Sequence, residues 1–179
     1  TAIAWEKAVE SVVQGAASPI LVPPSSVLCD ARDLRQQLPE DRYDLVITSP
    51  PYPNRMSYIR ELRPYMFWLS YLRDGRAAGE LDWQAIGGTW GCATSNVGKW
   101  MPEAEASIAY PAFEELIARI GERSPLLSRY VHKYFHDMVH HAVSLAAVLR
   151  RGGRAHYIVG NSKFYDVLVP VERIFASLF

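Results

Sequence analysis

The stretch at residues 43–52, YDLVITSPPY, constrains the fold of this chain more than any other part of the sequence. Residues 45–48 are apolar or β-branched and are typical of a buried strand in a parallel sheet. Pro50 and Pro51 then end the strand, because two successive prolines lack the N–H groups that a central strand needs. Ligands bind beyond the carboxyl ends of strands in open α/β sheets, so we expect a site at residues 49–52.

Residues 49–52 form the tip that follows the expected strand. The chemical groups of this tip suit methyl transfer to an aromatic amine. The exocyclic amine of cytosine or adenine donates its lone pair into the ring, which makes it a poor nucleophile. Ser49 Oγ and the Pro50 carbonyl can accept both amine hydrogens and turn the lone pair toward a methyl donor. Tyr52 offers a ring for stacking to a base that has been flipped out of a duplex. Ser49, Pro50, Pro51 and Tyr52 are therefore the candidate catalytic residues, and a simple proline-rich turn is the alternative.

Residues 48–52 resemble the motif Asp/Asn/Ser-Pro-Pro-Tyr/Phe/Trp of the S-adenosylmethionine-dependent amino methyltransferases of DNA. In that family the Ser-Pro-Pro-Tyr form is associated mainly with cytosine-N(4) methylation, and the Asp-Pro-Pro-Tyr form with adenine. Residues 27–47 are similar to the family's succession of strand, Asp, short helix and motif strand. The resemblance covers residues 26–72 and 142–175, which is under half of the chain.

The resemblance implies an α/β Rossmann-like fold with a mostly parallel sheet flanked by helices, and S-adenosylmethionine as cofactor. It also implies that Asp30 and Ala31, after an expected strand at residues 27–29, hold the adenosyl group. Without the resemblance, Asp30 or Asp33 is explained as the cap of a helix that runs to residue 38. The family's Phe-x-Gly-x-Gly cofactor loop is absent, and residues 160–162 (GNS) do not replace it. We therefore expect an incomplete domain that by itself binds the cofactor weakly or not at all.

Asn54, Arg55 and Arg60 follow the tip and are the candidate contacts to nucleic acid. Arginines here can meet phosphates, although a solvated helix face explains them equally well. The chain carries 19 basic and 19 acidic residues, so a phosphate-binding surface has to be a local patch. Pro64 is expected to kink or break a helix at residues 56–72, whose aromatic residues are expected in the core.

The chain of 179 residues is consistent with a single domain. An insertion is expected at residues 73–123, and its first part, residues 73–109, has no period and is predicted as a loop over the active-site face. Periodicity and capping residues predict four more helices, a turn and a strand. The helices are expected at residues 1–15 (covering the sheet), 111–121, 124–149 and 171–179, the turn at 150–154 and the strand at 155–160.

His132, His136 and His140 recur every four residues within the expected helix at residues 124–149. This spacing is able to bind a metal, but no Glu or Cys accompanies it as in a zincin. We therefore interpret it as a partly buried polar stripe and expect no metal site. Cys29 and Cys92 make neither a disulfide framework nor a metal site.

These observations predict methyl transfer from S-adenosylmethionine to the exocyclic amine of a flipped DNA base, with cytosine-N(4) preferred over adenine-N(6). Such an enzyme would serve DNA modification, as in restriction-modification. Two alternatives remain: an RNA base methyltransferase, and a catalytically inactive nucleic-acid-binding module. No apolar run reaches the roughly 18 residues needed to cross a bilayer, so we expect a cytoplasmic protein that does not bind a membrane.

Overall fold

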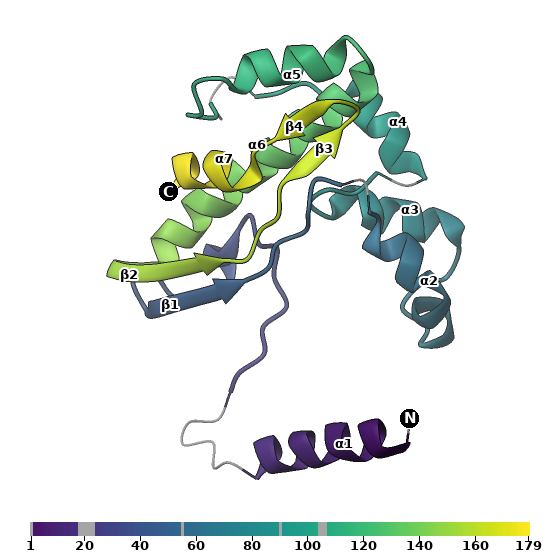
Figure 1. The fold of residues 1–179 in the computed structure, drawn as a ribbon, viewed down its shortest axis with the longest axis vertical. Helices are drawn as coiled ribbons and strands as arrows, with labels where there is room; N and C mark the ends of the chain where they lie inside the picture. Colours follow the sequence, from purple (N-terminus) through teal and green to yellow (C-terminus); the bar gives the residue numbers. More distant parts are fainter. Residues whose placement is uncertain (1, 18–23, 55, 90, 104–106) are drawn as a thin grey trace.

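A computed structural model describes residues 2–17, 24–54, 56–89, 91–103 and 107–179 (Figure 1). Within them the chain is a mixed α/β protein with seven α-helices, one 3₁₀ helix and four short strands. The helices are α1 (Ala2–Ala16), α2 (Tyr58–Trp68), α3 (Gly75–Gln84), α4 (Cys92–Lys99), α5 (Phe113–Gly121), α6 (Pro125–Val148) and α7 (Val171–Leu178), and the 3₁₀ helix is Leu34–Gln36. The strands are β1 (Tyr43–Thr48), β2 (Leu149–Tyr157), β3 (Ser162–Phe164) and β4 (Val167–Val169).

The strand predicted before the two prolines is β1, and it pairs in parallel with β2. Leu45 lies opposite Arg154 and Thr48 opposite Tyr157, and the Ile158 N–H extends the pairing by donating to the Thr48 carbonyl at 2.9 Å. The expectation that β1 is buried is wrong in part, because Ile47 is 69% exposed and Leu45 49% exposed. Only one face of this two-stranded sheet is covered by the described residues.

Helix α6 is the centre of the core. Ser124 caps it by accepting a hydrogen bond from the Leu127 N–H, and Pro125 occupies its first turn, as the sequence predicts. It contacts α4, α5, α7, β2 and the 3₁₀ helix, and its large buried side chains include Tyr134 and Phe135. None of the described helices combines the length and the apolar character needed to span a membrane.

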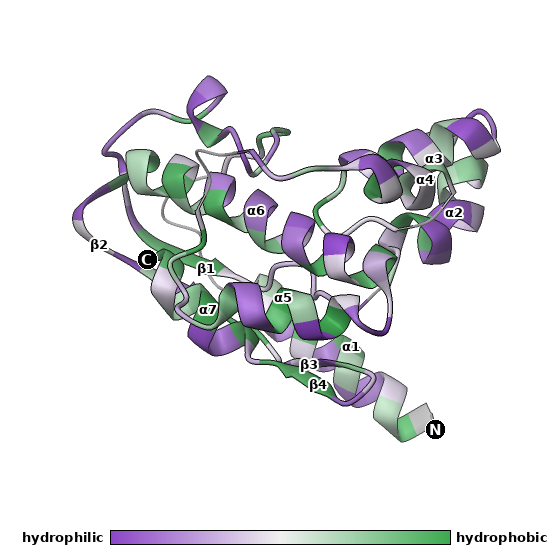
Figure 2. Ribbon diagram, turned by 90° about the horizontal axis from the view of Figure 1, so that it is seen from above, coloured by the Kyte–Doolittle hydropathy of each residue, from purple (hydrophilic) through white to green (hydrophobic). Residues whose placement is uncertain are grey.

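The antiparallel hairpin of β3 and β4 lies beside α5 and α7. Its strand β4 is hydrophobic along its whole length (Figure 2) and contacts α5. The sequence predicts α5 and α7 correctly, but it does not predict this hairpin. Residues 150–154, expected as a turn before a strand, belong to β2, and the turn is present as a bulge within it: Leu149 pairs with Tyr43 and Arg154 with Leu45, so residues 150–153 have no ladder partner in β1. Gly152, with φ of 79°, and a register shift between Tyr43 and Leu45 let the strand accommodate them.

The first part of the chain differs from expectation. Helix α1 forms as predicted, but it does not cover the sheet: it stands apart from the other elements in Figure 1, and its Trp5 is 72% exposed. Residues 27–29 form no strand, because they do not join the ladder of β1 and β2. The helix expected up to residue 38 is only the 3₁₀ turn Leu34–Gln36.

Helix α2 is shorter than predicted and runs through Pro64 without a break. Ser57 caps its first turn by accepting from the Arg60 N–H at 3.0 Å. Its aromatic residues were expected in the core, but Trp68 is 82% exposed and Tyr65 61% exposed. The reason is that α2 contacts α3, while the core forms around α6.

The loop predicted at residues 73–109 is wrong, because helices α3 and α4 lie within it. Asp74 caps α3 by accepting from the Ala77 N–H at 2.8 Å. The two helices contact each other through small residues: a Cβ added to Gly79 would lie 3.2 Å from Cys92 Sγ. Such close packing needs no apolar stripe, so hydrophobic periodicity does not reveal it.

Candidate functional site

The Ser49 side chain lies at the carboxyl end of β1, close to the segment that follows β2. Its Oγ is 3.1 Å from the Tyr52 hydroxyl and 3.3 Å from the Ile158 carbonyl oxygen. A carbonyl can only accept, so Ser49 donates its hydrogen to Ile158. The lone pairs of Ser49 Oγ therefore face the Tyr52 hydroxyl and can accept a hydrogen bond from that side.

The two prolines are held between α6 and the turn at residues 87–88. Pro50 is buried, and the Tyr134 hydroxyl of α6 donates to the Pro51 carbonyl at 2.7 Å. Burial raises the pKa of Tyr134 well above its ordinary value, so the hydroxyl keeps the hydrogen that it donates. Gly87, with φ of 79°, lies against both: a Cβ there would be 3.6 Å from the Tyr134 ring and 3.9 Å from Pro51 Cβ.

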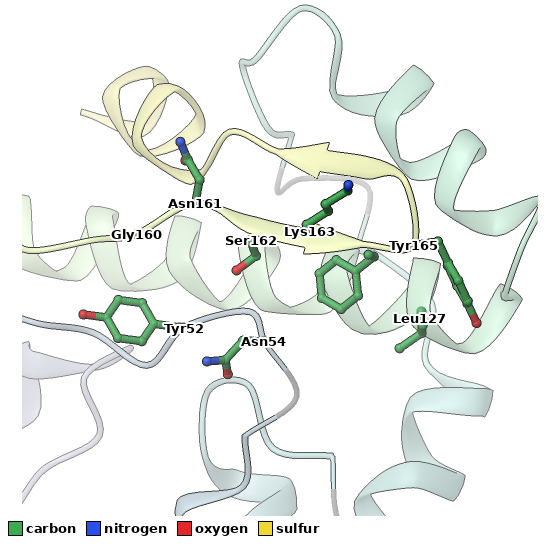
Figure 3. A pocket seen from close by; sticks show the side chains of 9 residues that line it. Tyr52, Asn54, Leu127, Gly160, Asn161, Ser162, Lys163 and Tyr165 are labelled. Carbon is green, nitrogen blue, oxygen red and sulfur yellow. The ribbon is translucent and has the colours of Figure 1, made fainter.

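An open pocket of about 570 Å³ lies beside Tyr52 (Figure 3). This volume is within the usual range for small-molecule sites. The Ser162 hydroxyl points to the side of Tyr52 and Asn54, whereas Asn161 and Lys163 point away from them (Figure 3). The pocket is lined by Tyr52 and Asn54 from the tip, Leu127 from α6, and Gly160, Asn161, Ser162, Lys163, Phe164 and Tyr165 from the chain after β2.

Asp30 and Ala31, the residues expected to hold the adenosyl group, do not line this pocket. Both Asp30 carboxylate oxygens accept from the Arg32 guanidinium, the shortest contact being 2.7 Å. This hydrogen bonding lowers the pKa of Asp30 below its ordinary value. Asp33 is the N-cap residue of the 3₁₀ helix, but its side chain makes no capping bond, so the capping explanation is not borne out for Asp33.

Ala31 is anchored to α6 and β2 by His141. The Ala31 carbonyl lies 2.7 Å from His141 Nδ1, which must carry a hydrogen because the carbonyl only accepts. The other ring nitrogen, Nε2, is 2.6 Å from the Tyr157 hydroxyl. Burial raises the pKa of Tyr157, so its hydroxyl keeps its hydrogen at neutral pH. This relay fixes the position of residue 31 relative to the sheet.

The candidate contacts to nucleic acid are separated in the structure. Asn54 lines the pocket, and its Oδ1 accepts from the Met56 N–H at 3.0 Å. Arg60 lies on α2 outside the pocket lining; its side chain is 61% exposed and its Nε is 3.9 Å from Glu61 Oε1. Arg55 lies outside the described residues.

Sequence reasoning missed two parts of the site, Tyr134 and the pocket wall formed by Ser162 and Phe164. The pocket wall comes directly after β2, just as the tip comes directly after β1. Adjacent parallel strands end at the same edge of a sheet, so the two segments lie together. Applying that rule to the expected strand at residues 155–160 would have found the wall. Tyr134 gives no such signal, because it resembles any core residue of a helix.

The histidine stripe of α6 is partly buried, as predicted, but the structure adds a carboxylate to it. Glu103, His136 and His140 bring one potential metal-ligating atom each to within 4.8 Å of one another. Glu103 belongs to the segment between α4 and α5, so helix spacing could not indicate it. These three residues line a different pocket from the one beside Tyr52, and the two pockets share no lining residue.

No family model, curated protein or solved structure matches this chain. The site is therefore interpreted from its own geometry and chemistry.

Proposed function

We propose that this chain contributes to methyl transfer from S-adenosylmethionine to the exocyclic amine of a flipped DNA base, preferring cytosine-N(4) to adenine-N(6). The supporting observation is that residues 49–52 follow β1 at the edge where its parallel partner β2 also ends, beside a pocket of suitable size. The unit of β1, α6 and β2 is consistent with part of a Rossmann-like domain.

In this proposal Ser49 accepts a hydrogen of the target amine. Its own hydrogen is directed to the Ile158 carbonyl, so its lone pairs are free for that role once the Tyr52 hydroxyl, 3.1 Å away, has turned aside. The Pro50 carbonyl takes the second amine hydrogen. Both acceptors gain strength as the nitrogen becomes tetrahedral, which lowers the barrier to transfer.

The pocket beside Tyr52 supports the binding of a base. Tyr52 and Phe164 supply aromatic surfaces, and stacking on an aromatic ring contributes about 1–3 kcal/mol per base. The Asn54 amide and the Ser162 hydroxyl supply hydrogen-bonding groups for a base edge. A flipped base therefore meets both kinds of contact that such enzymes use.

S-adenosylmethionine supplies the methyl group in this proposal. The described residues do not fit its adenosyl part as expected, because the Asp30 carboxylate is bonded to Arg32 and lies outside the pocket lining. The support for methyl transfer therefore comes from the residues proposed to contact the base, and not from those expected to hold the cofactor.

Substitution of Ser49 tests the proposed chemistry. In the intact natural protein, Ser49→Ala should lower the single-turnover rate of methyl transfer by about tenfold to a hundredfold, as expected for the loss of an acceptor worth about 1.4–2.8 kcal/mol in the transition state. Affinity for a duplex with a mismatch at the target base should stay nearly constant, because Ser49 acts mainly in the transition state. An unchanged rate would contradict the role of Ser49.

Substitution of Tyr52 tests base capture. Tyr52→Ala should weaken binding to the mismatched duplex, whereas Tyr52→Phe keeps the ring and should retain most of the binding and activity. If Phe is as damaging as Ala, Tyr52 does not act by stacking. If the intact protein binds the duplex but transfers no methyl group to DNA or RNA, the chain belongs to an inactive binding module.

A further inference from the structure

The residues Glu103, His136 and His140 lie together on one side of α6. His136 and His140 are four residues apart, so their rings lie on the same face of the helix, with centroids 4.7 Å apart. Glu103 reaches them from the segment before α5. Its Oε2 is 3.8 Å from His140 Nε2, and its backbone N–H donates a hydrogen bond to His136 Nε2, with 3.4 Å between the two nitrogens. Two imidazoles and a carboxylate thus converge from two separate parts of the chain.

The position of His136 distinguishes it from an ordinary surface histidine. It is only 4% exposed, and its ring packs edge-on against Trp100 with a centroid distance of 5.3 Å. His132, one turn earlier, packs against Trp100 and Phe113 and takes no part in the group. The polar-stripe interpretation therefore accounts for His132 but leaves the convergence on His136 and His140 unexplained.

The neighbouring charges are already paired, so they do not oppose a cation. Lys133 Nζ is 2.6 Å from Asp137 Oδ2, and Arg32 contacts the other Asp137 oxygen at 3.3 Å as well as Asp30. Arg32, Lys133 and Asp137 line an open pocket of about 330 Å³ together with Glu103, His136 and His140. The pocket leaves room for a metal ion with a water molecule as a further ligand.

We propose that Glu103, His136 and His140 bind a zinc ion, which ties the segment at residues 100–103 to α6. Two imidazole nitrogens and a carboxylate oxygen form a ligand set that Zn²⁺ accepts, with water in the fourth position. Tetrahedral binding requires the ligand atoms to be about 3.3 Å apart, given bond lengths of about 2.0–2.1 Å. The Glu103 side chain is 71% exposed and free to make the small movement that this requires. Binding through His136 Nε2 also requires the Glu103 N–H, which donates a long hydrogen bond to that nitrogen, to turn away from it.

Zinc titration of the chelator-treated protein by calorimetry tests the site. The wild-type protein should bind one Zn²⁺ with micromolar or tighter affinity. His140→Ala and Glu103→Gln should each weaken binding by about tenfold or more, as loss of a ligand does. Both side chains are substantially exposed, so these variants should fold. His156→Ala, at an exposed position of β2, is the matched control and should bind zinc like the wild type.

The Glu103→Gln variant decides between a built site and a bare histidine pair. If it binds zinc as tightly as the wild type, only the two helical histidines bind, and the proposal is wrong. The absence of wild-type binding would overturn it as well. A second measurement is the visible spectrum with Co²⁺, which should show the intense bands of a tetrahedral ion in the wild type and lose them in His140→Ala. Neither measurement depends on methyl transfer, so a failure of the proposed function would leave this test intact.

Discussion

The hydroxyl of Tyr134 connects the candidate site to the core of the molecule. It is 1% exposed and donates to the Pro51 carbonyl, 83 residues away along the chain. Loss of the donor to a partly buried carbonyl costs free energy to the extent that water does not replace the bond. Tyr134 therefore positions the tip without itself lining the pocket.

Tyr134→Phe isolates this hydrogen bond because the ring remains in place. We expect the free energy of unfolding to fall by about 0.5–1.5 kcal/mol, with up to about 3 kcal/mol if the Pro51 carbonyl stays unsatisfied. Urea denaturation measures the change. Tyr71→Phe is the control, since Tyr71 is 74% exposed and its substitution should have little effect. Equal stability of the Tyr134 variant and the wild type would show that the bond contributes nothing.

At the scale of elements, helix α3 and the turn after it place residue 87 against the tip. The Gly88 backbone lies so close to α3 that an added Cβ would be 1.6 Å from the Asp82 carbonyl oxygen. Asp82 itself is 1% exposed and accepts from the Ser57 hydroxyl, which joins the start of α2 to α3. The turn and both helices are therefore tightly packed around Asp82.

Gly88→Ala should disturb this packing strongly, because the new methyl group meets backbone rather than a movable side chain. We expect a loss of about 1–3 kcal/mol or more in the free energy of unfolding. Gly75→Ala is the matched control: a Cβ at Gly75 meets nothing within 4 Å, so the change should stay within about 0.5 kcal/mol. Thermal denaturation of both variants compares them directly, and similar losses would contradict the close approach at Gly88.

At the scale of the whole molecule, burial of α6 makes stability depend on pH. His132 packs among Trp100 and Phe113, and burial lowers its pKa below the ordinary value of 6.5, with Glu114 opposing the shift. As the pH falls through 6.5, the unfolded chain takes up a proton there before the folded chain does. Acid therefore favours the unfolded state through this residue.

The free energy of unfolding should accordingly be lower at pH 5.5 than at pH 7.5, as tested by urea denaturation at both values. His132→Gln should reduce this difference, whatever its effect on stability at neutral pH, because it removes a group that takes up the proton. His156→Gln, at an exposed position, should keep the wild-type difference. An unchanged pH dependence in the His132 variant would mean that burial of His132 contributes nothing to it.

Features that depend only on neighbouring residues could be predicted from the amino-acid sequence. The end of β1 follows from Pro50 and Pro51, which cannot donate to a ladder, and the start of α6 follows from the Ser124 cap. Helices α5 and α7 are likewise predicted from the spacing of apolar residues within each segment. The candidate site is therefore readable from sequence as far as Ser49 to Tyr52.

Contacts between groups that are distant in the sequence could not be predicted and are seen in the folded chain. Pairing with a partner strand is not a local property, so residues 27–29 look like a strand and are not one. Tyr134 reaches Pro51, Ser162 lines the pocket of Tyr52, and Glu103 approaches His136 because α6 packs against several elements at once. Local propensity sets the backbone of each element, but contacts between elements depend on how their surfaces pack, and a single sequence pattern does not encode that.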